Sequence, residues 1–393
     1  MTNLRIGLFS NAYRPVVSGV VNSLVEIRRG LLKRDHRPFL FAPEVKGYQE
    51  AHAGVFRFPS VDLDPSVGFP VPIPFSAKLT RLIQRMNLSL IHSHHPILIG
   101  GAAANFARKL RIPLVYTFHT QIEQYTHYVP FFRQQYVKDR TRKKMRQYLS
   151  KCDLIICPSP GIRQVIDSYN VGKPVVTLPN AIDLTKFESP APRTSLRDRL
   201  GLPEHALISL SVGRLAPEKG LPFLFRAFAD VEQENHHLVV VGRGPQENEL
   251  RNFVQRLGVC HRVHFLGPVP YSEMPSLYAQ SDLFAICSTT EVKPLVVLEA
   301  LASGLPVLAV AACGTQDTLT DGFDGFLCDL DYEQYSRAWR RMANEPGLRA
   351  EFGENATITA SAYSIETYLE RLCCLYQETV NRACQKSWKS ATG

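Results

Sequence analysis

The chain has 393 residues, of which 45% are hydrophobic and 21% are charged. This composition is typical of a folded globular protein and excludes a disordered chain. The net charge of +9 is unevenly distributed: residues 1–190 carry 26 Lys and Arg against 12 Asp and Glu, whereas residues 191–393 carry 19 against 24. The basic first half therefore predicts an anionic partner, either nucleic acid or a membrane surface.

The start of the chain and its cysteines predict a cytoplasmic protein. The first apolar run is too short for a signal peptide and is typical of a β-strand. No stretch approaches the roughly 20 apolar residues that span a bilayer. The nine cysteines are odd in number and scattered, which indicates a reducing compartment.

Short apolar runs alternate with helical patterns along the whole chain, which is typical of parallel α/β layers. The predicted strands of the first half are Leu4–Phe9, Arg37–Phe41, Leu88–His92, Leu114–Thr117, Leu154–Cys157 and Val175–Leu178. Those of the second half are Ile208–Val212, His237–Val241, Val263–Phe265, Leu283–Cys287, Val307–Ala309 and Gly325–Leu327. Helices such as Gly220–Glu234 and Gln246–Leu257 are predicted between them.

We therefore expect an α/β protein with two doubly wound, Rossmann-like parallel sheets of about six strands each. The break is expected near the polar, proline-rich stretch Pro179–Leu200. Residues 1–190 and 191–365 are the two predicted domains, and residues 366–393 are predicted to return toward the first domain as an amphipathic helix. Ligands of such sheets bind at the carboxyl ends of the strands. Two sheets that face each other would enclose a cleft.

The strongest chemical signal begins after the strand Leu283–Cys287. Glu291 is expected in the following loop and Glu299 in the next helix, whose first turn would contain Pro294 and Leu295. The two carboxylates therefore do not form a side-by-side acid/base pair. They are predicted to accept hydrogen bonds from separate hydroxyls of one elongated ligand, with a phosphate at the helix N-terminus. The alternative is that both are solvated surface acids.

A second signal is the glycine-punctuated turn Gly213-Arg-Leu-Ala-Pro-Glu-Lys-Gly220, again between a strand and a helix. Arg214 and Lys219 would direct two cations at the carboxyl edge of the sheet. There they would stabilise a diphosphate leaving group. The alternative is an ordinary cationic helix start, which is unusual because helix N-termini favour acids.

Together these motifs resemble the retaining glycosyltransferases of family 4, which have the GT-B fold. The resemblance rests on the two motifs above, on Val239-Val-Val-Gly-Arg-Gly-Pro245 and on Val263-His-Phe-Leu-Gly267. It covers essentially the whole chain. A dinucleotide-binding alternative is weaker, because Glu247 occupies the third glycine position of that fingerprint.

The resemblance implies a role for each matching residue. Glu291 would bind hydroxyls of the donor sugar and Glu299 those of the ribose, while the main chain at Val269 would hold the nucleobase. The diphosphate would contact Arg214 and Lys219, with Leu295 as a further donor-binding position.

In the first half, Gly19 would let the backbone approach the donor phosphate, and His119 would line the reaction centre. A lone histidine after a strand is more often a structural hydrogen-bonding residue. The sequence departs from the family at Pro294, where glycine is usual; proline removes a backbone donor there. We expect no metal and no other cofactor, because His92, His94 and His95 have no evident carboxylate or cysteine partners.

The segments Ile6–Val20 and Tyr116–Pro130 resemble more narrowly the diacylglycerol glucosyltransferases of this family. Residues 131–151 then carry eight cations and one acid, with Phe132, Tyr136, Met145 and Leu149 at helical spacing. This pattern predicts an amphipathic helix on an anionic lipid surface. Its predicted membrane-binding cations are Arg133, Lys138, Arg140, Arg142, Lys143, Lys144 and Arg146. The alternative is a helix that packs on its own sheet with a solvated basic face.

The sequence thus predicts a peripheral enzyme of the cytoplasmic membrane face that moves glucose or galactose from a UDP-sugar to a glycerolipid, with retention of configuration. No nucleic-acid module accompanies the basic segment, so nucleic acid is not an expected partner. Two alternatives stay open: a soluble sugar or sugar-phosphate acceptor, and a non-catalytic binding protein on a degenerate transferase scaffold.

Overall fold

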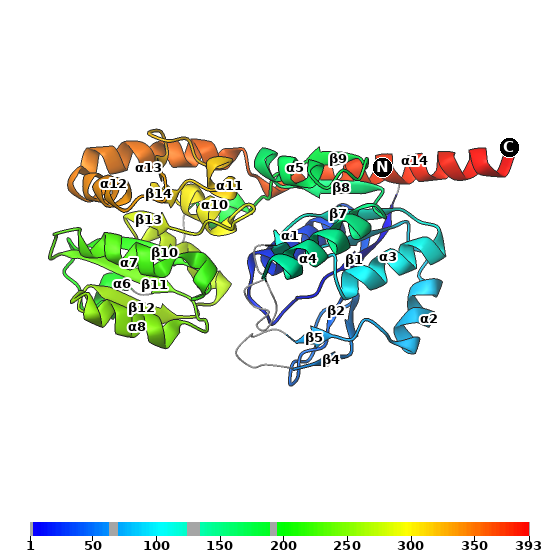
Figure 1. Ribbon diagram of the computed structural model, residues 1–393, viewed down its shortest axis with the longest axis horizontal. Coiled ribbons are helices and arrows are strands. Elements are labelled where there is room, and N and C mark those ends of the chain that lie inside the picture. The colour runs from blue at the N-terminus through cyan, green and yellow to red at the C-terminus, as the bar shows by residue number, and fades with distance from the viewer. Residues whose placement is uncertain (1–2, 63–69, 124–133, 189–194, 393) are drawn as a thin grey trace. The chain divides into compact units, whose positions relative to one another are not determined.

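A computed structural model describes residues 3–62, 70–123, 134–188 and 195–392 (Figure 1). The chain divides into two compact units: Met1–Asn180 together with Ile365–Gly393, and Ala181–Ser364. The first unit ends earlier than the break after residue 190 that the sequence suggested. Each unit contains one parallel sheet with helices on its faces.

The first sheet has the strand order β3-β2-β1-β6-β7-β8-β9 and is parallel throughout. Its strands are β1 Arg5–Phe9, β2 Arg37–Pro43, β3 Val55–Phe58, β6 Leu90–Ser93, β7 Leu114–Thr117, β8 Leu154–Cys157 and β9 Val175–Thr177. A short antiparallel pair is formed by β4 (Ser60–Val61) and β5 (Val71–Pro72). The helices of this unit are α1 Gly19–Lys33, α2 Ala77–Arg85, α3 Ile99–Leu110, α4 Gln134–Leu149, α5 Pro160–Asp167 and α14 Ile365–Thr392.

The second sheet has the order β12-β11-β10-β13-β14-β15, also parallel. Its strands are β10 Leu207–Val212, β11 His236–Val241, β12 Val263–Gly267, β13 Leu283–Ile286, β14 Val307–Val310 and β15 Gly325–Cys328. The α-helices are α6 Leu196–Leu200, α7 Leu221–Ala229, α8 Glu247–Arg256, α9 Met274–Ala279, α10 Leu295–Ala302, α11 Cys313–Gln316, α12 Tyr332–Asn344 and α13 Pro346–Ser361. The described residues of this unit also form the short 3-10 helices η2 Leu184–Lys186, η3 Pro217–Lys219 and η4 Tyr271–Glu273.

Alternate residues of the second sheet enter two separate cores, one on each face. Phe284 of β13 packs with residues of α9, α10 and α13. Its neighbour Leu283 packs with residues of α7, α8 and α12, including the buried Trp339. Because both faces are covered, central strands such as β13 and β14 are continuous apolar runs, as is typical of parallel sheets.

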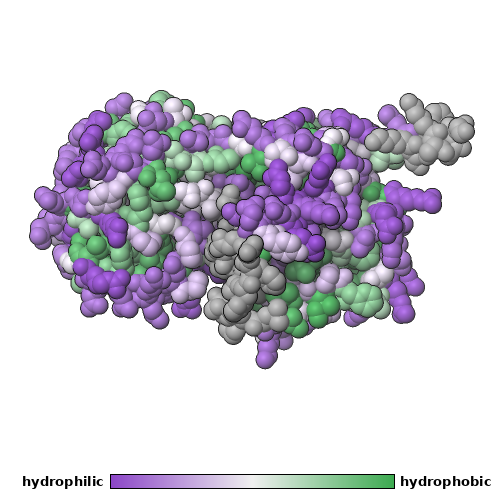
Figure 2. Space-filling model, in the orientation of Figure 1, coloured by the Kyte–Doolittle hydropathy of each residue, from purple (hydrophilic) through white to green (hydrophobic). Residues whose placement is uncertain are grey.

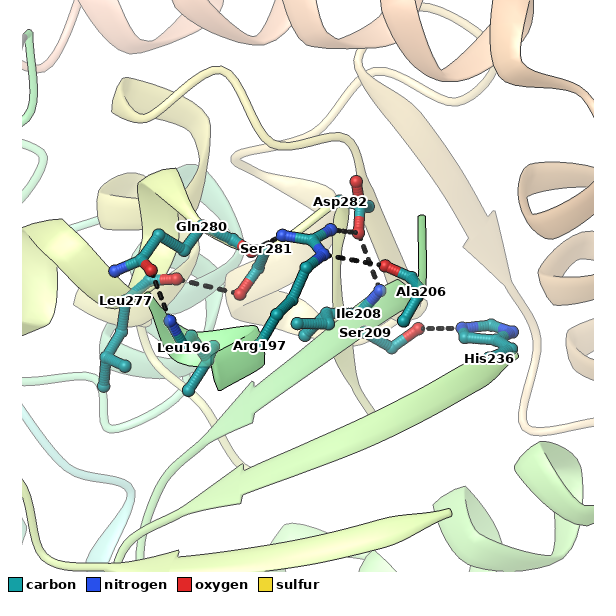
Figure 3. A network of polar contacts seen from close by, with 10 residues as sticks. All are labelled: Leu196, Arg197, Ala206, Ile208, Ser209, His236, Leu277, Gln280, Ser281 and Asp282. Carbon is teal, nitrogen blue, oxygen red and sulfur yellow. Dashed lines mark hydrogen bonds and ion pairs between the residues drawn. The ribbon is translucent and has the colours of Figure 1, made fainter. Parts of the chain in front are cut away.

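A polar network holds the amino ends of β10 and β13 (Figure 3). The Asp282 carboxylate accepts hydrogen bonds from the Ile208 amide at 2.7 Å and from the Arg197 guanidinium at 2.9 Å. Arg197 also donates to the carbonyl oxygens of Ala206 and Gln280. This network fixes one end of both strands and leaves their carboxyl ends to form the loops described below.

The C-terminal helix α14 packs on α1 of the first unit. A Cβ atom at Gly30 would lie 2.0 Å from the Leu369 side chain, so the glycine allows the two helices to approach closely. Arg34 forms an ion pair with Glu366 at 2.6 Å across the same contact. None of the helices in the described ranges is long and apolar enough to cross a membrane.

Candidate functional site

The strand order of the second sheet changes direction at β10. The chain runs from β10 outward through β11 and β12, and then returns to place β13 on the other side of β10. Such a switch point is where open α/β sheets bind their ligands, beside the carboxyl ends of the strands. The loop after β10 contains Arg214 and Lys219, and the loop after β13 contains Glu291.

Two glycines allow these loops to meet through their backbones. Gly242, after β11, has φ +138, and a Cβ atom there would lie 1.9 Å from the carbonyl oxygen of Gly213. Gly220 has φ +63, and a Cβ atom there would lie 2.8 Å from the carbonyl oxygen of Cys287. Both the left-handed backbone and the close approach exclude larger residues. The loops after β10, β11 and β13 therefore form one compact edge.

Lys219 and Glu291 are in direct contact at this edge. The Lys219 Nζ atom donates a hydrogen bond to Glu291 Oε1, with side chains 24% and 19% exposed. Burial alone would raise the pKa of Glu291, but the Lys219 charge and hydrogen bonds from Lys219 and Ser288 hold it below its usual value. Glu291 is therefore an ionised hydrogen-bond acceptor. The second predicted cation, Arg214, lies partly buried in the same loop as Lys219.

Helix α10 places the second carboxylate behind this pair. Glu299 is 2% exposed, and its Oε2 accepts a hydrogen bond from the Tyr278 hydroxyl at 2.9 Å. Burial raises the pKa of Glu299, against the opposite effect of hydrogen bonds from Tyr278 and Tyr271. Since Glu291 is also largely buried, the alternative that both are solvated surface acids is wrong.

The start of α10 differs slightly from the prediction. Pro294 is the N-cap, with φ −71 and no side-chain cap, rather than a residue of the first turn. Leu295, the first helical residue, is only 7% exposed. Its side chain belongs to the core, so only its backbone N–H can face a ligand.

The half-buried Val269 follows β12 at the same carboxyl edge, after Gly267 with φ +71. It packs against the core that contains Leu298. The main chain at this position lies in a loop beyond the sheet, and the nucleobase contact expected there stays a prediction.

Lys293 was missed by the sequence reasoning. Its Nζ atom donates to the Asp317 carbonyl at 2.8 Å and the Tyr363 hydroxyl at 3.0 Å, which fixes the loop that carries Glu291. Burial lowers the pKa of Lys293 to about 8, with Asp317 acting in the opposite direction.

The first sheet has an equivalent switch point between β1 and β6. Gly19 begins α1 after the β1 loop and is exposed, and the Ser18 hydroxyl caps this helix by accepting from the Val21 amide at 3.3 Å. His119 follows β7, the neighbour of β6, and is partly buried.

Four histidines gather at this edge, and the structure separates their roles. His119 Nε2 lies 2.9 Å from His94 Nδ1. His95 Nδ1 accepts from the Asn11 amide at 3.1 Å. His92 contacts the Tyr376 hydroxyl at 2.6 Å and the Thr117 hydroxyl at 2.8 Å. His92 and His95 therefore have structural partners, whereas His94 contacts His119, a pairing that the sequence reasoning missed.

The buried His92 gives stability a pH dependence. Burial lowers the pKa of His92 to about 3, whereas the unfolded chain binds the proton near the ordinary value of 6.5. Between these two pH values the unfolded state thus binds more protons than the folded state. The contribution of the neutral His92 to the free energy of unfolding is therefore fully present above pH 6.5 and decreases as the pH falls below it. We expect a loss of about 1.4 kcal/mol per pH unit from this residue. Urea titrations at pH values from 7 to 4.5 measure the free energy of unfolding. This free energy should fall less steeply with decreasing pH in His92→Gln than in the unaltered protein, and an equal dependence on pH would contradict this account.

Helix α4 contains the cations that were predicted to bind a membrane. Lys138, Arg140, Arg142, Lys143, Lys144 and Arg146 are all exposed. Hydrophilic side chains gather over this helix in Figure 2. Arg142 also contacts Glu123 at 3.6 Å and the Ser168 carbonyl at 2.9 Å. Arg133 and Phe132 lie outside the described residues.

The apolar face of α4 corrects the prediction. Met145 and Leu149 are 1% and 0% exposed, and the Tyr148 ring packs edge-on against Tyr116 of β7 at 5.2 Å. This face is therefore part of the unit's own core and is not available to lipid, while Tyr136 is 56% exposed. In the described part of the helix, the basic face and Tyr136 remain on the surface.

Helix α1 and the residues just after it carry a second basic cluster, which is partly neutralised: Arg28, Arg29, Lys33, Arg34 and Arg37. Arg29 pairs with Glu26, and Arg34 pairs with Glu366. Arg28 donates to the Ala53 carbonyl.

Within the described ranges, no group of three or more His, Cys, Asp or Glu side chains could hold a metal ion.

Comparison with known proteins gives the family. Residues 17–186 match glycosyltransferase family 4, and residues 192–359 match the glycosyl transferases of group 1. An α-monoglucosyldiacylglycerol synthase of Streptococcus pneumoniae is 34% identical over 318 residues, which cover 78% of this chain and 71% of the relative. The chain belongs to the family 4 glycosyltransferases.

Other relatives of this glycosyltransferase bear two different names. An α-monoglucosyldiacylglycerol synthase of Acholeplasma laidlawii is 27% identical over 98% of this chain and 99% of its own length. A D-inositol 3-phosphate glycosyltransferase of Corynebacterium kroppenstedtii is 30% identical over 76% of this chain and 69% of its own length.

Solved structures agree on the fold. Sucrose-phosphate synthase from Thermosynechococcus elongatus matches with a TM-score of 0.80 at 21% identity, over 96% of this chain and 99% of that one. The Anabaena protein HepE, solved with UDP and glucose, matches with a TM-score of 0.76 at 22% identity, over 96% and 100%. The glycosyltransferase therefore has the predicted GT-B fold, with two Rossmann-like parallel-sheet domains.

Proposed function

We propose that this glycosyltransferase moves a hexose, glucose or galactose, from a UDP-sugar to a hydroxyl of a glycerolipid such as diacylglycerol, with retention of configuration. The observation that carries the proposal is the Lys219–Glu291 pair at the switch point of the second sheet. It joins a cation for the diphosphate to an ionised acceptor for sugar hydroxyls. The names of two relatives support the lipid acceptor, and the UDP and glucose bound to HepE support the donor.

The residues of the second unit hold the donor in this proposal. Glu291 accepts hydrogen bonds from the transferred sugar, and Glu299 accepts them from the ribose. Arg214 and Lys219 stabilise the negative charge that develops on the leaving nucleoside diphosphate. The backbone at Leu295 contacts phosphate, and the backbone at Val269 contacts the nucleobase. These cations supply the positive charge at the leaving group, so we propose no metal and no further cofactor.

In the first unit, we propose that His119 contacts the reacting groups and that Gly19 admits a donor phosphate, as the family resemblance implies. The acceptor is proposed to bind this unit, whose net charge is basic.

The membrane association proposed here is electrostatic. The exposed cations of α4 would contact the anionic lipids of the cytoplasmic membrane face, each contributing about 1 kcal/mol. Because the apolar face of α4 is buried in its own unit, the described part of the helix contributes charge rather than apolar insertion. We infer a peripheral protein that salt releases from the membrane.

A paired substitution tests this membrane contact. Lys143→Gln with Lys144→Gln should weaken binding to liposomes with anionic phospholipid by about 2 kcal/mol, or roughly 30-fold. The matched control is Arg337→Gln with Arg340→Gln, which removes two exposed cations from α12 and should change nothing. Sedimentation with liposomes, at low and at physiological salt, measures the membrane binding of both double variants. Equal loss in the two variants, or no binding by the unaltered protein, would contradict the membrane contact.

A soluble acceptor is the second candidate, because a relative named D-inositol 3-phosphate glycosyltransferase is 30% identical. The basic first unit would then bind the acceptor's phosphate. A competition assay separates the two functions: labelled UDP-hexose is offered with diacylglycerol liposomes and a soluble sugar phosphate together. We expect the label in the lipid phase, and label in the aqueous product would favour the second candidate.

A further inference from the structure

Two histidine rings at the carboxyl edge of the first sheet share one hydrogen bond. His94, which follows β6, and His119, which follows β7, lie on neighbouring strands. His94 Nδ1 and His119 Nε2 are 2.9 Å apart, and the rings are nearly parallel with centroids 5.1 Å apart. One of these nitrogens must therefore donate and the other must accept.

Both rings are neutral in the folded protein. Burial, together with the neighbouring histidines, lowers the pKa of His94 well below its ordinary value. Burial likewise lowers the pKa of His119 to about 3. Each neutral ring carries a single N–H, so only two arrangements of the pair are possible.

The far nitrogen of His94 distinguishes the two arrangements. His94 is 1% exposed, and its Nε2 atom is buried without a hydrogen-bond partner among the described residues. If His119 donated to His94 Nδ1, the only proton of His94 would lie on Nε2, as a buried and unsatisfied N–H. If His94 donates from Nδ1, its Nε2 is a bare lone pair. Buried donors without partners are rarer than under-satisfied acceptors, so the second arrangement is favoured.

From this geometry we propose that His94 is a positioning residue, which donates from Nδ1 to His119 Nε2 and so fixes the proton of His119 on Nδ1. His119 Nδ1 makes no hydrogen bond within the described part of the chain. His119 then presents a hydrogen-bond donor to a hydroxyl of the transferred sugar or of the acceptor, and it does not act as a base through that atom. The role at the hydroxyl rests on the proposed function; the tautomer does not.

The surroundings hold the His94 ring in place. Its amide donates to the Phe9 carbonyl of β1 at 2.9 Å. Its ring packs against His92 at a centroid distance of 4.1 Å. His92 is in turn fixed by the Tyr376 hydroxyl of α14 and by Thr117 of β7. Elements β1, β6, β7 and α14 thus orient one ring, which is the usual way in which a histidine tautomer is set.

Nitrogen NMR of the full-length protein tests the tautomer directly. With 15N-labelled histidine, and His119→Gln to assign the signal, we expect His119 to be protonated at Nδ1 and bare at Nε2. A spectrum with the proton on Nε2 of His119 would overturn the proposal whatever the enzyme's activity. This readout also separates the inference from the proposed function, because it needs no substrate.

Two variants then test the consequence for catalysis. His94→Phe keeps an aromatic ring but removes the donor, and kcat should fall about tenfold or more, the effect of one lost hydrogen bond of about 1.4 kcal/mol. The KM for the UDP-hexose should change less than kcat. His94→Asn places an amide N–H near the lost Nδ1, so it should restore both the tautomer and most of kcat. Thermal unfolding shows whether the His94→Phe protein is folded. A folded His94→Phe protein that is fully active and still has the proton of His119 on Nδ1 would contradict the role of His94.

Discussion

Replacing Glu291 by glutamine should lower kcat for hexose transfer by roughly 100- to 1,000-fold, the range found for removing one well-placed electrostatic contact. Glutamine has nearly the same shape but no charge. It therefore loses both the ion pair with Lys219 and the charged acceptor for sugar hydroxyls. The pKa of Glu291 is held below its usual value, so the carboxylate is ionised at neutral pH and the substitution removes a full charge.

The matched control for this prediction is Glu204→Gln. Glu204 is an exposed glutamate of the same unit, away from the switch point, and its loss should leave kcat unchanged. Circular dichroism and thermal unfolding should show that both variants are folded, because glutamine keeps nearly the size and shape of the glutamate side chain that it replaces. Near-normal turnover by a folded Glu291→Gln protein would remove Glu291 from the mechanism.

Replacing Gly242 by alanine should reduce the free energy of unfolding by about 3 kcal/mol or more. The new Cβ atom would lie 1.9 Å from the Gly213 carbonyl oxygen, in a backbone with φ +138. The clash must separate the loops after β10 and β11, and the first of these carries Arg214 and Lys219. We therefore expect weaker binding of UDP as well as lower stability.

Gly258 provides the control for this prediction. It has φ +73, but nothing lies within 4 Å of a Cβ atom there. Gly258→Ala should cost about 1 kcal/mol from the left-handed backbone alone and should leave UDP binding intact. Urea titration and calorimetry with UDP measure the two effects. An equal loss of unfolding free energy in Gly242→Ala and Gly258→Ala would contradict this prediction, because it would show that the loops after β10 and β11 can separate freely.

The sequence was sufficient to predict the two parallel sheets and the strands that carry the site. Strands such as β8 and β13, buried on both faces, are continuous apolar runs of four residues with no competing pattern. Strand β3 escaped prediction because Val55–Phe58 contains Arg57 and is only partly buried. Its pairing with β2 is a property of the assembled sheet.

Two features of the sites depended on tertiary contacts that a residue pattern does not contain. The apolar spacing of α4 was consistent with lipid or with a protein core, and only the packing of Met145 and Leu149 decided between them. The His94–His119 pair joins residues 25 positions apart. The adjacency of β6 and β7 could have indicated that the two residues lie close together. The orientation of the His94 ring toward His119, however, depends on its packing against His92, which Tyr376 holds in place.

The most direct test of the central claim is the product of the reaction itself. The purified protein is incubated with UDP-glucose and, separately, with UDP-galactose, over liposomes of diacylglycerol and an anionic phospholipid. Mass spectrometry and proton NMR of the extracted lipids then identify the product. We predict a monohexosyl lipid from one of the two donors, with the anomeric configuration of the donor retained. Intact UDP-hexose in both reactions, with no glycosylated lipid although the protein has bound the liposomes, would contradict the account.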